Sequence, residues 1–518
     1  MGAWHRSSVG ARNRSTNSGN PECVASIKAE SYREQSMAAT GGLLPGNPKL
    51  CRRDFVRTGV SVLAGLALPT SGSSRVTRQT TVYERINEYL HSIPAIAAHD
   101  HLRPPDELRG YVETEHGRGM NLYGLWSTSY YEQNGLTRWK PGETFDEWWG
   151  QARHDFDSAR ATTLYRYMLP AFQDLYGVDF DKITDAQARE LDRRIFRNYE
   201  KASEWIDYIV TERANIELII IDPYWSPLSY PTAYRFQARN LNTSSLLRGF
   251  HPSEYKDPRN DPFRFAREHA IAVNTLDDYV ALLDRLCREA KEQGAVCLTD
   301  DGTAYDRTLQ FDNVPAERAA RAFGRKRSEL TPQEIKDFED FIMWRLVELG
   351  AQYDLPYQIH TGDGRLQGSS PMLLLDMIEA NPKTKFCLMH GGFPWVGETG
   401  AIAFEEMEKA KNVWIDSCWL PTISYTMAKR ALHEWLELGP SNRILWGTDE
   451  GHAEGIYAAA EFTRRCLGEV LVEKIERRDL SEQQAMRIAK QIMRDNALEL
   501  FPRLKPHLWK GARNADNL

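Results

Sequence analysis

The segment Ile93-Pro94-Ala95-Ile96-Ala97-Ala98-His99-Asp100-His101 joins an apolar run to two histidines that are two residues apart. Three later segments have the same form, an apolar run that ends in a side chain able to bind a cation: PYQIHTG (356–362), KFCLMHGG (385–392) and RILWGTD (443–449). Short apolar runs of this kind predict buried β-strands. The carboxyl ends of parallel strands meet at one rim of a barrel, and the runs would deliver five side chains there: His99, His101, His360, His390 and Asp449.

From about Arg78 onward, strand-like and helix-like segments alternate, which is typical of parallel α/β architecture. Eight strand-like runs can be counted, of which the third is weak, and they contain His99, 216–222, 234–239, Val296, Tyr357, Phe386, Val413 and Ile444. The predicted fold class is therefore α/β. We expect a (β/α)8 TIM-like barrel with a helical insertion after strand 1 and extra C-terminal helices.

Helical periodicity and end signals predict the helices between these strands. Residues 277–293 carry apolar residues at helical spacing and stop before Gly294. Thr331 and Glu334 form a capping box that opens a helix ending at about Tyr353. Further helices are predicted at 371–380, 424–438, 454–472 and 481–500. Two insertions are predicted, a helical cap at about 104–207 and a second segment at 223–274.

The amino-terminal residues predict a targeting signal rather than a folded domain. The paired Arg52 and Arg53, the nearby Phe55 and a weak apolar stretch resemble a twin-arginine export signal. We therefore expect a periplasmic or otherwise exported protein. The alternative is a chance Arg-Arg pair in a basic tail and a cytoplasmic protein. The expected organisation is a disordered extension or misplaced start at 1–36, a signal and linker at 37–78, the barrel with its cap at 79–505, and a tail at 506–518.

Composition limits the partners of the chain. The 518 residues are 42% hydrophobic and 26% charged, which is sufficient for a large buried core. The net charge is −7 and no basic run follows a helix, which argues against a nucleic-acid partner. The apolar stretch near the amino terminus is too short for a stable membrane span. Seven cysteines without a CxxC pair favour buried free thiols over disulfides. A small-molecule substrate is expected, and a homo-oligomer is compatible with the sequence.

Each candidate ligand has an ordinary structural explanation when it is considered alone. The histidine pair could be solvated at a strand end, and His360 could be a core histidine bonded to a carbonyl. His390 could serve in a turn, and Asp449 could cap the helix that follows it. The recurrence of all five at equivalent strand ends favours a shared metal site over these separate explanations.

The order HxH, QIHTG, LMHGG and LWGTD resembles the amidohydrolase superfamily, in particular its branch of metal-dependent hydrolases and decarboxylases. The similarity extends over residues 84–501 and is densest over 356–496. It implies a metal site made of His99, His101, His360 and Asp449. It further implies that Asp449 accepts a proton, and that His390 contacts the substrate or a metal-bound water as an acid/base group or electrophile.

The fourth strand distinguishes one-metal from two-metal sites. Many two-metal relatives carry a bridging lysine or glutamate there, whereas this strand reads VCLTDD (296–301). One divalent ion is therefore predicted, with Zn²⁺ favoured and Mn²⁺ or another ion as the alternative. An unorthodox ligand role for Asp300 is the alternative that this strand leaves open. Zn²⁺ would lower the pKa of bound water to about 7 and polarise a carbonyl oxygen. Asp449 would accept and return the proton, and His390 would stabilise the oxyanion.

Two arginines are predicted to bind a substrate carboxylate through their forked guanidinium groups. Arg103 comes two residues after the histidine pair, and Arg365 lies in the loop after His360. The alternative is that both are ordinary loop arginines paired with aspartates. Five further side chains follow strand ends and are predicted either to line the pocket or to pack beneath the cap: Tyr224, Trp225, Trp395, Trp419 and His452.

The sequence thus predicts a mononuclear metal-dependent hydrolase of the amidohydrolase type, acting on a small amide, ester or lactone that carries a carboxylate. Metal-dependent non-oxidative decarboxylation of a carboxylic acid is the first alternative, because the same residues serve both reactions. A non-catalytic binding barrel is the second, and the retention of all five site residues speaks against it. Glucuronate isomerase shares the superfamily and an HxH segment, but its other signatures are absent from this chain.

Overall fold

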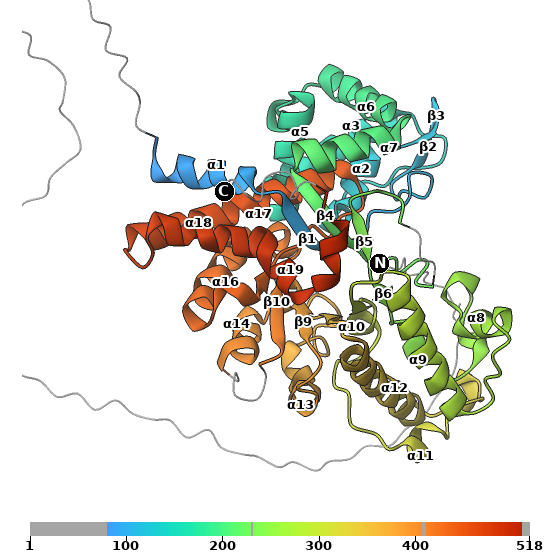
Figure 1. The fold of residues 1–518 in the computed structure, drawn as a ribbon. Helices are drawn as coiled ribbons and strands as arrows, with labels where there is room; N and C mark the ends of the chain where they lie inside the picture. The colour runs from blue at the N-terminus through green and yellow to red at the C-terminus, as the bar shows by residue number, and fades with distance from the viewer. Residues whose placement is uncertain (1–79, 229–231, 406–410, 510–518) are drawn as a thin grey trace, which may run out of the picture. The chain divides into compact units, whose positions relative to one another are not determined.

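The computed structural model describes residues 80–228, 232–405 and 411–509 (Figure 1). Thr77–Leu518 forms one compact unit. The extension predicted at 1–36 and the signal and linker predicted at 37–78 lie outside the described residues, as does the end of the predicted tail, 510–518.

Eight strand positions close a parallel barrel in chain order. They are β1 (Ala95–Asp100), β4 (Ile216–Ile221), β5 (Gln237–Arg239) with β6 (Leu241–Asn242), β7 (Leu298–Asp300), β8 (Tyr357–His360), β9 (Phe386–Met389), β10 (Val413–Asp416) and β11 (Ile444–Leu445). Only Asn240 separates β5 from β6; the first pairs with β4 and the second with β7. The amide of Ala98 donates to the carbonyl of Trp446 at 2.9 Å, which joins the last strand to the first. The predicted α/β class and (β/α)8 barrel are confirmed, including the weak third strand.

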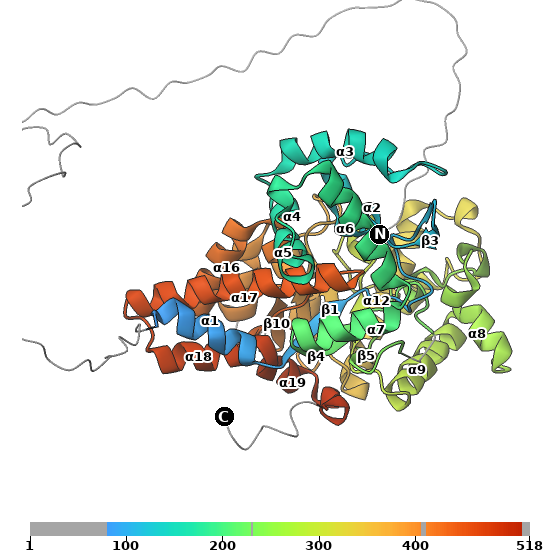
Figure 2. The ribbon, with the colours of Figure 1, turned by 90° about the horizontal axis from the view of Figure 1, so that it is seen from above.

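Helices follow the strands on the outside of the barrel. Thr331 and Glu334 form the predicted capping box at the start of α12 (Pro332–Tyr353). The helix predicted at 481–500 is divided by a π-helical turn, Gln491–Asp495. Figure 2 shows α1 (Val82–Ser92), α17 (Ala453–Glu476) and α18 (Glu482–Lys490) packed together. The other outer helices are α8 (Pro262–Glu268), α9 (Leu276–Glu292), α10 (Thr303–Asp306), α11 (Ala316–Ala319), α13 (Leu375–Ala380), α14 (Val396–Gly400), α15 (Leu420–Ile423), α16 (Tyr425–Leu438) and α19 (Asn496–Leu500).

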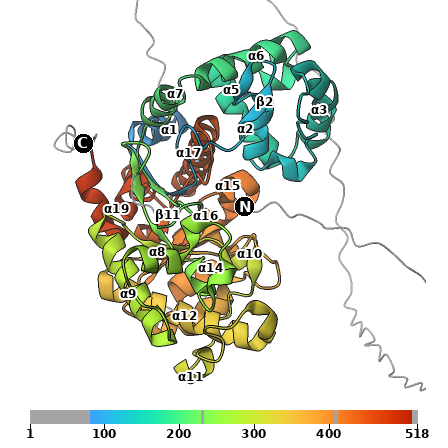
Figure 3. The same ribbon diagram turned by 90° about the vertical axis from the view of Figure 1, so that its right-hand side faces the viewer.

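Residues 102–208, which we call the inserted segment, separate β1 from β4 and are mostly helical. They form a hairpin, β2 (Val112–Thr114) with β3 (Gly117–Gly119), and the helices α2 (Leu122–Thr128), α3 (Phe145–Ala159), α4 (Thr163–Arg166), α5 (Leu169–Tyr176), α6 (Asp185–Tyr199) and α7 (Ala202–Tyr208). Their core is aromatic: the buried Trp126 stacks on Tyr165 with ring centroids 5.6 Å apart and also packs against Phe156 and Phe172. Figure 3 shows these helices gathered on one side of the barrel.

A buried carboxylate joins the inserted segment to the barrel. Glu454, in the first turn of α17, accepts hydrogen bonds from the hydroxyls of Tyr176 and Tyr199, each at 2.6 Å. The indole N–H of Trp205 donates to the same carboxylate at 2.9 Å. Because α17 starts only four residues after Asp449, one helix start anchors both the inserted segment and the loop that carries a candidate ligand.

Asp192 of α6 makes the stability of the inserted segment depend on pH. Its carboxylate is buried and accepts a hydrogen bond from the amide of Leu122 at 2.9 Å. Burial raises the pKa of Asp192 to about 7, although the Leu122 hydrogen bond opposes this. The folded protein therefore holds this proton more tightly than the unfolded chain does. As a result, the free energy of unfolding falls as the pH rises from the ordinary aspartate pKa to about 7.

We expect Asp192→Asn to raise the melting temperature at pH 8, because asparagine keeps an acceptor for Leu122 and carries no charge. The gain in unfolding free energy should approach about 4 kcal/mol. The aspartate pKa differs by about 3 between the folded and the unfolded chain, and a difference of 1 corresponds to about 1.36 kcal/mol. The gain should disappear near pH 3, where the aspartate is protonated in both states. Thermal unfolding at the two pH values tests this, with the exposed Asp479→Asn as control. Identical melting temperatures at pH 8 would contradict it.

The amino-terminal end of the barrel is closed by the C-terminal segment. Buried strand residues, among them Ile96, Leu218 and Cys387, form one apolar cluster with Phe501 and Leu504. These two residues belong to the end of α19 and to the short helix Pro502–His507 that follows it. The barrel interior is therefore a packed core, and chemistry is confined to the carboxyl ends of the strands.

The five cysteines in the described part of the chain are free and buried, as predicted: Cys287, Cys297, Cys387, Cys418 and Cys466. Within the same part of the chain, no helix has the length and apolar character needed to cross a membrane.

Candidate metal centre

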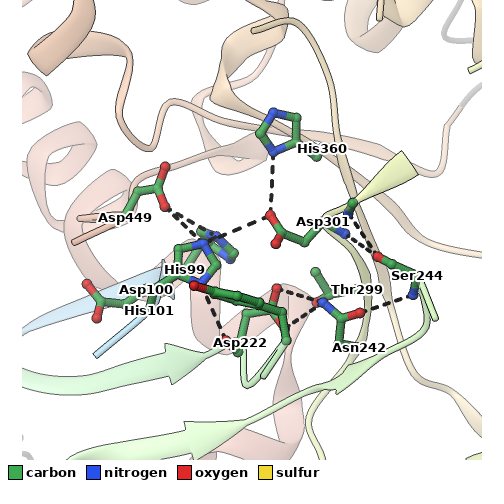
Figure 4. A network of polar contacts seen from close by, with 12 residues as sticks. His99, Asp100, His101, Asp222, Asn242, Ser244, Thr299, Asp301, His360 and Asp449 are labelled. Atoms are coloured by element: carbon green, nitrogen blue, oxygen red, sulfur yellow. Dashed lines mark hydrogen bonds and ion pairs between the residues drawn. The ribbon is translucent and has the colours of Figure 1, made fainter. Parts of the chain in front are cut away.

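The predicted ligand and acid/base side chains all lie at the carboxyl ends of barrel strands, and Figure 4 shows four of them. His99 lies in β1 and His101 directly follows it, while His360 is the last residue of β8. His390 follows β9, and Asp449 lies four residues after β11. All five are buried, with at most 6% of their surface exposed. The structure therefore brings together residues that are far apart in the sequence.

Asp100 fixes the loop of Asp449 against the end of β1. Because successive strand residues point to opposite faces, Asp100 faces away from the two histidines that flank it. Its carboxylate accepts hydrogen bonds from the hydroxyl of Thr448 and from the amide of Glu450, the latter at 3.2 Å. Asp449 lies between these two donors and adopts a left-handed φ of 56°. Such a backbone conformation is uncommon for a residue other than glycine and is frequent at functional sites.

Short contacts link the five side chains, each to the next, around the barrel mouth. Nε2 of His99 is 3.1 Å from Nε2 of His101 and 3.6 Å from Oδ1 of Asp449. The same Asp449 oxygen is 3.2 Å from His101 Nε2. The other oxygen, Oδ2, is 3.8 Å from Nδ1 of His390. Nε2 of His390 is in turn 2.8 Å from Nδ1 of His360.

Asp301 completes the circle between His101 and His360. Its Oδ1 lies 3.9 Å from His101 Nε2 and 3.7 Å from His360 Nδ1. We call this closed set of residues the polar ring: His99, His101, Asp301, His360, His390 and Asp449.

Asp300, left open as a further ligand on the fourth strand, is not among the residues that the structure gathers into a candidate metal cluster. Its Oδ1 accepts hydrogen bonds from the hydroxyls of Ser244 at 2.8 Å and Thr303 at 2.7 Å. Side chains alternate along the end of β7, so the neighbouring Asp301 faces the mouth instead. The signal for Asp301 was present in the paired aspartates of this strand, but the pair does not reveal which member points inward.

Asp222 is a second residue that the prediction omits. It follows β4, and Nδ2 of Asn242 donates to both of its carboxylate oxygens at 3.0 Å. His99, His101, Asp222 and Asp301 each offer one ligand atom, and these atoms lie within 4.8 Å of one another. The strand-like run 216–222 ends in this aspartate, so its form matches that of the four runs from which the ligands were predicted.

The side chains of the polar ring have strongly shifted pKa values. Burial and the neighbouring His101 lower the pKa of His99 to about 4. Burial would also lower the pKa of His101, but the Asp449 carboxylate, 3.2 Å away, and the charge of Asp301 raise it to about 10. Although burial opposes it, His101 lowers the pKa of Asp449 to about 2, and His360 holds the pKa of Asp301 well below its usual range. At neutral pH the ring thus contains two carboxylates and one imidazolium from these four residues.

The donor set of the polar ring fits a divalent cation. Both carboxylate oxygens of Asp449 and Nε2 of His360 are buried without a hydrogen-bond partner among the described residues. Unpaired polar atoms are costly in a buried site, and a cation that takes up their lone pairs removes this cost. Imidazole nitrogens and carboxylate oxygens are also the ligands that Zn²⁺ and Mn²⁺ accept in proteins.

Aromatic side chains surround the polar ring. The ring of Tyr224 lies 5.1 Å from that of His101, and Tyr305 lies 4.8 Å from His360. Trp419 is 5.9 Å from His390. The hydroxyl of Tyr305 and the indole N–H of Trp419 are buried without a hydrogen-bond partner among the described residues, which leaves both available to a ligand. Tyr224 and Trp419 were predicted pocket residues, whereas Tyr305 was not.

His452, another predicted pocket residue, has a structural position instead. Its Nδ1 accepts a hydrogen bond from the amide of Gly455 at 3.0 Å, so it caps α17. Its Nε2 is 2.8 Å from the hydroxyl of Ser129 in the inserted segment. Trp395 makes no ring contact with the polar ring among the described residues.

The two predicted substrate arginines occupy different places. Arg103 donates from Nη2 to the hydroxyl of Tyr224 at 3.0 Å, and is therefore one aromatic side chain away from the polar ring. Arg365 is exposed and donates to the carbonyl of Asp306 at 3.1 Å. It lines a cavity of about 1090 Å³ beside the mouth, and within the described residues it does not contact the polar ring.

Comparison with known proteins places the site in context. A family model described as Amidohydrolase matches residues 229–503, which is more than half of the chain. Protein fluG of Emericella nidulans is 32% identical over 206 residues, which make up 37% of this chain and 23% of that protein. The chain therefore spans about a quarter of the length of this curated relative.

Solved structures with a similar barrel were also found. Uronate isomerase of Thermotoga maritima is 15% identical, with a TM-score of 0.65, and the match covers 81% of this chain and 97% of that one. Glucuronate isomerase of Caulobacter crescentus is 13% identical, with a TM-score of 0.60, and the match covers 81% and 94% of the two chains. At such identities the likeness is one of fold.

Proposed function

This chain belongs to the amidohydrolase family and is a metal-dependent enzyme, and we propose that it hydrolyses a small amide, ester or lactone that carries a carboxylate. The observation that carries the proposal is the meeting of the Asp449 carboxylate with the paired imidazoles of His99 and His101 inside a buried polar ring. A carboxylate in this place can accept a proton directly beside a bound cation.

We propose that the ring holds one divalent cation, Zn²⁺ in the first instance and Mn²⁺ as the alternative. His99, His101 and Asp449 are the proposed ligands on one side, and His360 faces them across the ring together with Asp301. When bound, the cation supplies Lewis-acid polarisation of the substrate carbonyl and lowers the pKa of adjacent water to about 7.

Asp449 and His390 are the proposed acid/base residues. Asp449 accepts the proton of the attacking water and returns it to the leaving group. The Nδ1 of His390 lies 3.3 Å from the carbonyl of Cys418, and its Nε2 lies 2.8 Å from Nδ1 of His360. One of the two nitrogens of the neutral imidazole donates a hydrogen bond and the other accepts one. Burial and the nearby His360 hold the pKa of His390 well below its usual range, which keeps its imidazole neutral. A neutral His390 imidazole can therefore accept a proton on one nitrogen while the other nitrogen donates a hydrogen bond.

A substrate screen in oxygen-18 water tests the reaction class. We expect the zinc-loaded protein to hydrolyse carboxylate-bearing amides, esters or lactones and to place one solvent oxygen in the product acid. Removal of the cation by a chelator should lower turnover at least about tenfold, and Zn²⁺ or Mn²⁺ should restore it. Metal analysis should give one equivalent per chain.

Two outcomes would contradict the proposed hydrolysis. Release of CO₂ from carboxylic acids as the sole turnover would identify a decarboxylase. Interconversion of hexuronates without a change of mass would identify an isomerase. Two tightly bound equivalents of metal per chain would contradict the single-cation site but not hydrolysis.

A further inference from the structure

The backbone of Asp449 is held in an uncommon conformation. Its φ of 56° lies in the left-handed region, which residues other than glycine rarely adopt and which persists where the surrounding structure enforces it. The backbone sets the direction of the side chain, and Figure 4 shows the Asp449 carboxylate turned toward His99 and His101. On the barrel side, the amide of Asp449 donates to the carbonyl of His99 at 3.2 Å. The end of β1 therefore holds one side of the Asp449 backbone.

The inserted segment holds the other side of this backbone through Tyr130. The hydroxyl of Tyr130 donates to the carbonyl oxygen of Asp449 at 3.1 Å, and both residues are buried. Loss of this donor would be costly, because a buried carbonyl needs a hydrogen-bond partner. Tyr130 precedes Asp449 by 319 residues and lies outside the region 229–503 that matches the family model. The support therefore comes from the insertion and not from the matched region.

Further contacts hold Tyr130 in place against the loop that carries Asp449. The backbone of Tyr130 is itself left-handed, with a φ of 62°. The preceding residue, Ser129, is buried, and its Oγ lies 2.8 Å from Nε2 of His452. The hydroxyl of Tyr167 donates to the carbonyl of Ser129 at 3.2 Å. Two consecutive residues of the inserted segment thus contact the same loop.

We propose that Tyr130 is a positioning residue that sets the direction of the Asp449 carboxylate in the polar ring. This rests on the proposed function, which assigns Asp449 to cation binding and proton transfer, and it makes the inserted segment a support of the metal site. In this role Tyr130 acts through the backbone of Asp449. Residues that support a metal ligand in this way change metal affinity or activity by about 10–100-fold when they are replaced.

Tyr130→Phe tests the proposal because it removes only the hydroxyl. The phenyl ring keeps its packing against Trp419, whose ring centroid lies 5.0 Å away. We expect about tenfold weaker Zn²⁺ binding in competition with a chromophoric chelator. The visible absorption of bound Co²⁺, which depends on the geometry of its ligands, should also change. In turnover, kcat should fall about tenfold while KM stays within about twofold, since no contact with the substrate is removed.

Tyr131→Phe is the matched control. Tyr131 is the adjacent residue, and its hydroxyl also donates to a backbone carbonyl, that of Asp155 at 3.2 Å inside the inserted segment. Each variant removes one hydrogen bond between a hydroxyl and a carbonyl, so a general loss of stability should lower both melting temperatures. Only Tyr130→Phe should alter the Zn²⁺ affinity and the Co²⁺ spectrum.

A double-mutant cycle with Asp449→Asn distinguishes positioning from a general structural effect. If Tyr130 acts through Asp449, Tyr130→Phe should change the Zn²⁺ affinity less than about twofold once the carboxylate is absent, so that the two losses do not add. Tyr167→Phe, which removes the donor to the Ser129 carbonyl, is measured in parallel and should move the same readouts in the same direction. A folding defect in one variant then does not decide the result.

Unchanged Zn²⁺ affinity and an unchanged Co²⁺ spectrum in Tyr130→Phe would overturn the positioning role. So would equal losses in Tyr130→Phe and Tyr131→Phe, or losses in Tyr130→Phe and Asp449→Asn that add. Failure of the proposed hydrolysis is distinguishable, because the two cation readouts do not depend on turnover. A wild-type chain that binds neither Zn²⁺ nor Co²⁺ would overturn the metal site and the positioning role together.

Discussion

Asp449→Asn is expected to lower kcat by about a thousandfold, within the range of general acid–base catalysis. The carboxylate lies 3.2 Å from His101 and 3.6 Å from His99, and its pKa of about 2 keeps it ionised at neutral pH. Asparagine has nearly the same shape but cannot accept a proton. Steady-state kinetics on a substrate from the hydrolysis screen, at equal metal content per chain, gives the measurement.

The exposed Asp376→Asn serves as the matched control and should retain full activity. Metal analysis of Asp449→Asn separates two roles: bound cation with lost turnover indicates proton transfer, whereas lost cation indicates ligation. If kcat stays within about tenfold of the wild-type value, Asp449 is not the proton acceptor.

Asp301→Asn is expected to weaken cation binding by at least about a hundredfold, which equals the upper effect seen for residues that merely support ligands. The Asp301 carboxylate lies between His101 and His360, at 3.9 Å and 3.7 Å, and those histidines hold its pKa well below the usual range. The substitution removes one of the two negative charges of the polar ring. Competition with a chromophoric chelator measures the change.

Asp300→Asn is the matched control for this experiment because Asp300 is the adjacent residue and its Oδ1 bonds Ser244 and Thr303. An asparagine still accepts hydrogen bonds from Ser244 and Thr303, so cation affinity should remain close to that of the wild type. The opposite pattern, with affinity lost in Asp300→Asn and retained in Asp301→Asn, would show that Asp300 is the ligand after all.

The strand ends that carry histidine were predictable because an apolar run followed by a metal-competent residue is a local pattern. His360 and His390 needed no knowledge of the rest of the chain. Asp301 was not predictable in the same way, since choosing between two adjacent aspartates requires the direction in which the end of β7 points. Asp222 followed an equally clear apolar run, and the prediction omitted it.

Tertiary contacts also determine where the two predicted substrate arginines lie. Local sequence places Arg103 and Arg365 after strand ends alike, yet only Arg103 reaches an aromatic neighbour of the polar ring. The backbone amide of Arg365 donates to the carbonyl of Ala304, which turns its loop toward α10. The inserted segment was predicted to be helical, but the hairpin β2–β3 depends on a short turn at Glu115 and His116 that carries no strong turn signal.

The closure of β1 against the end of β11 bears on how the protein is made. Asp100 and Thr448 are 348 residues apart, and the hydrogen bond between them exists only when both ends of the barrel are present. A ribosome must therefore release nearly the whole chain before the two histidines of β1 meet Asp449. Until then the growing sheet has two unpaired edges, which favour misassembly with other chains.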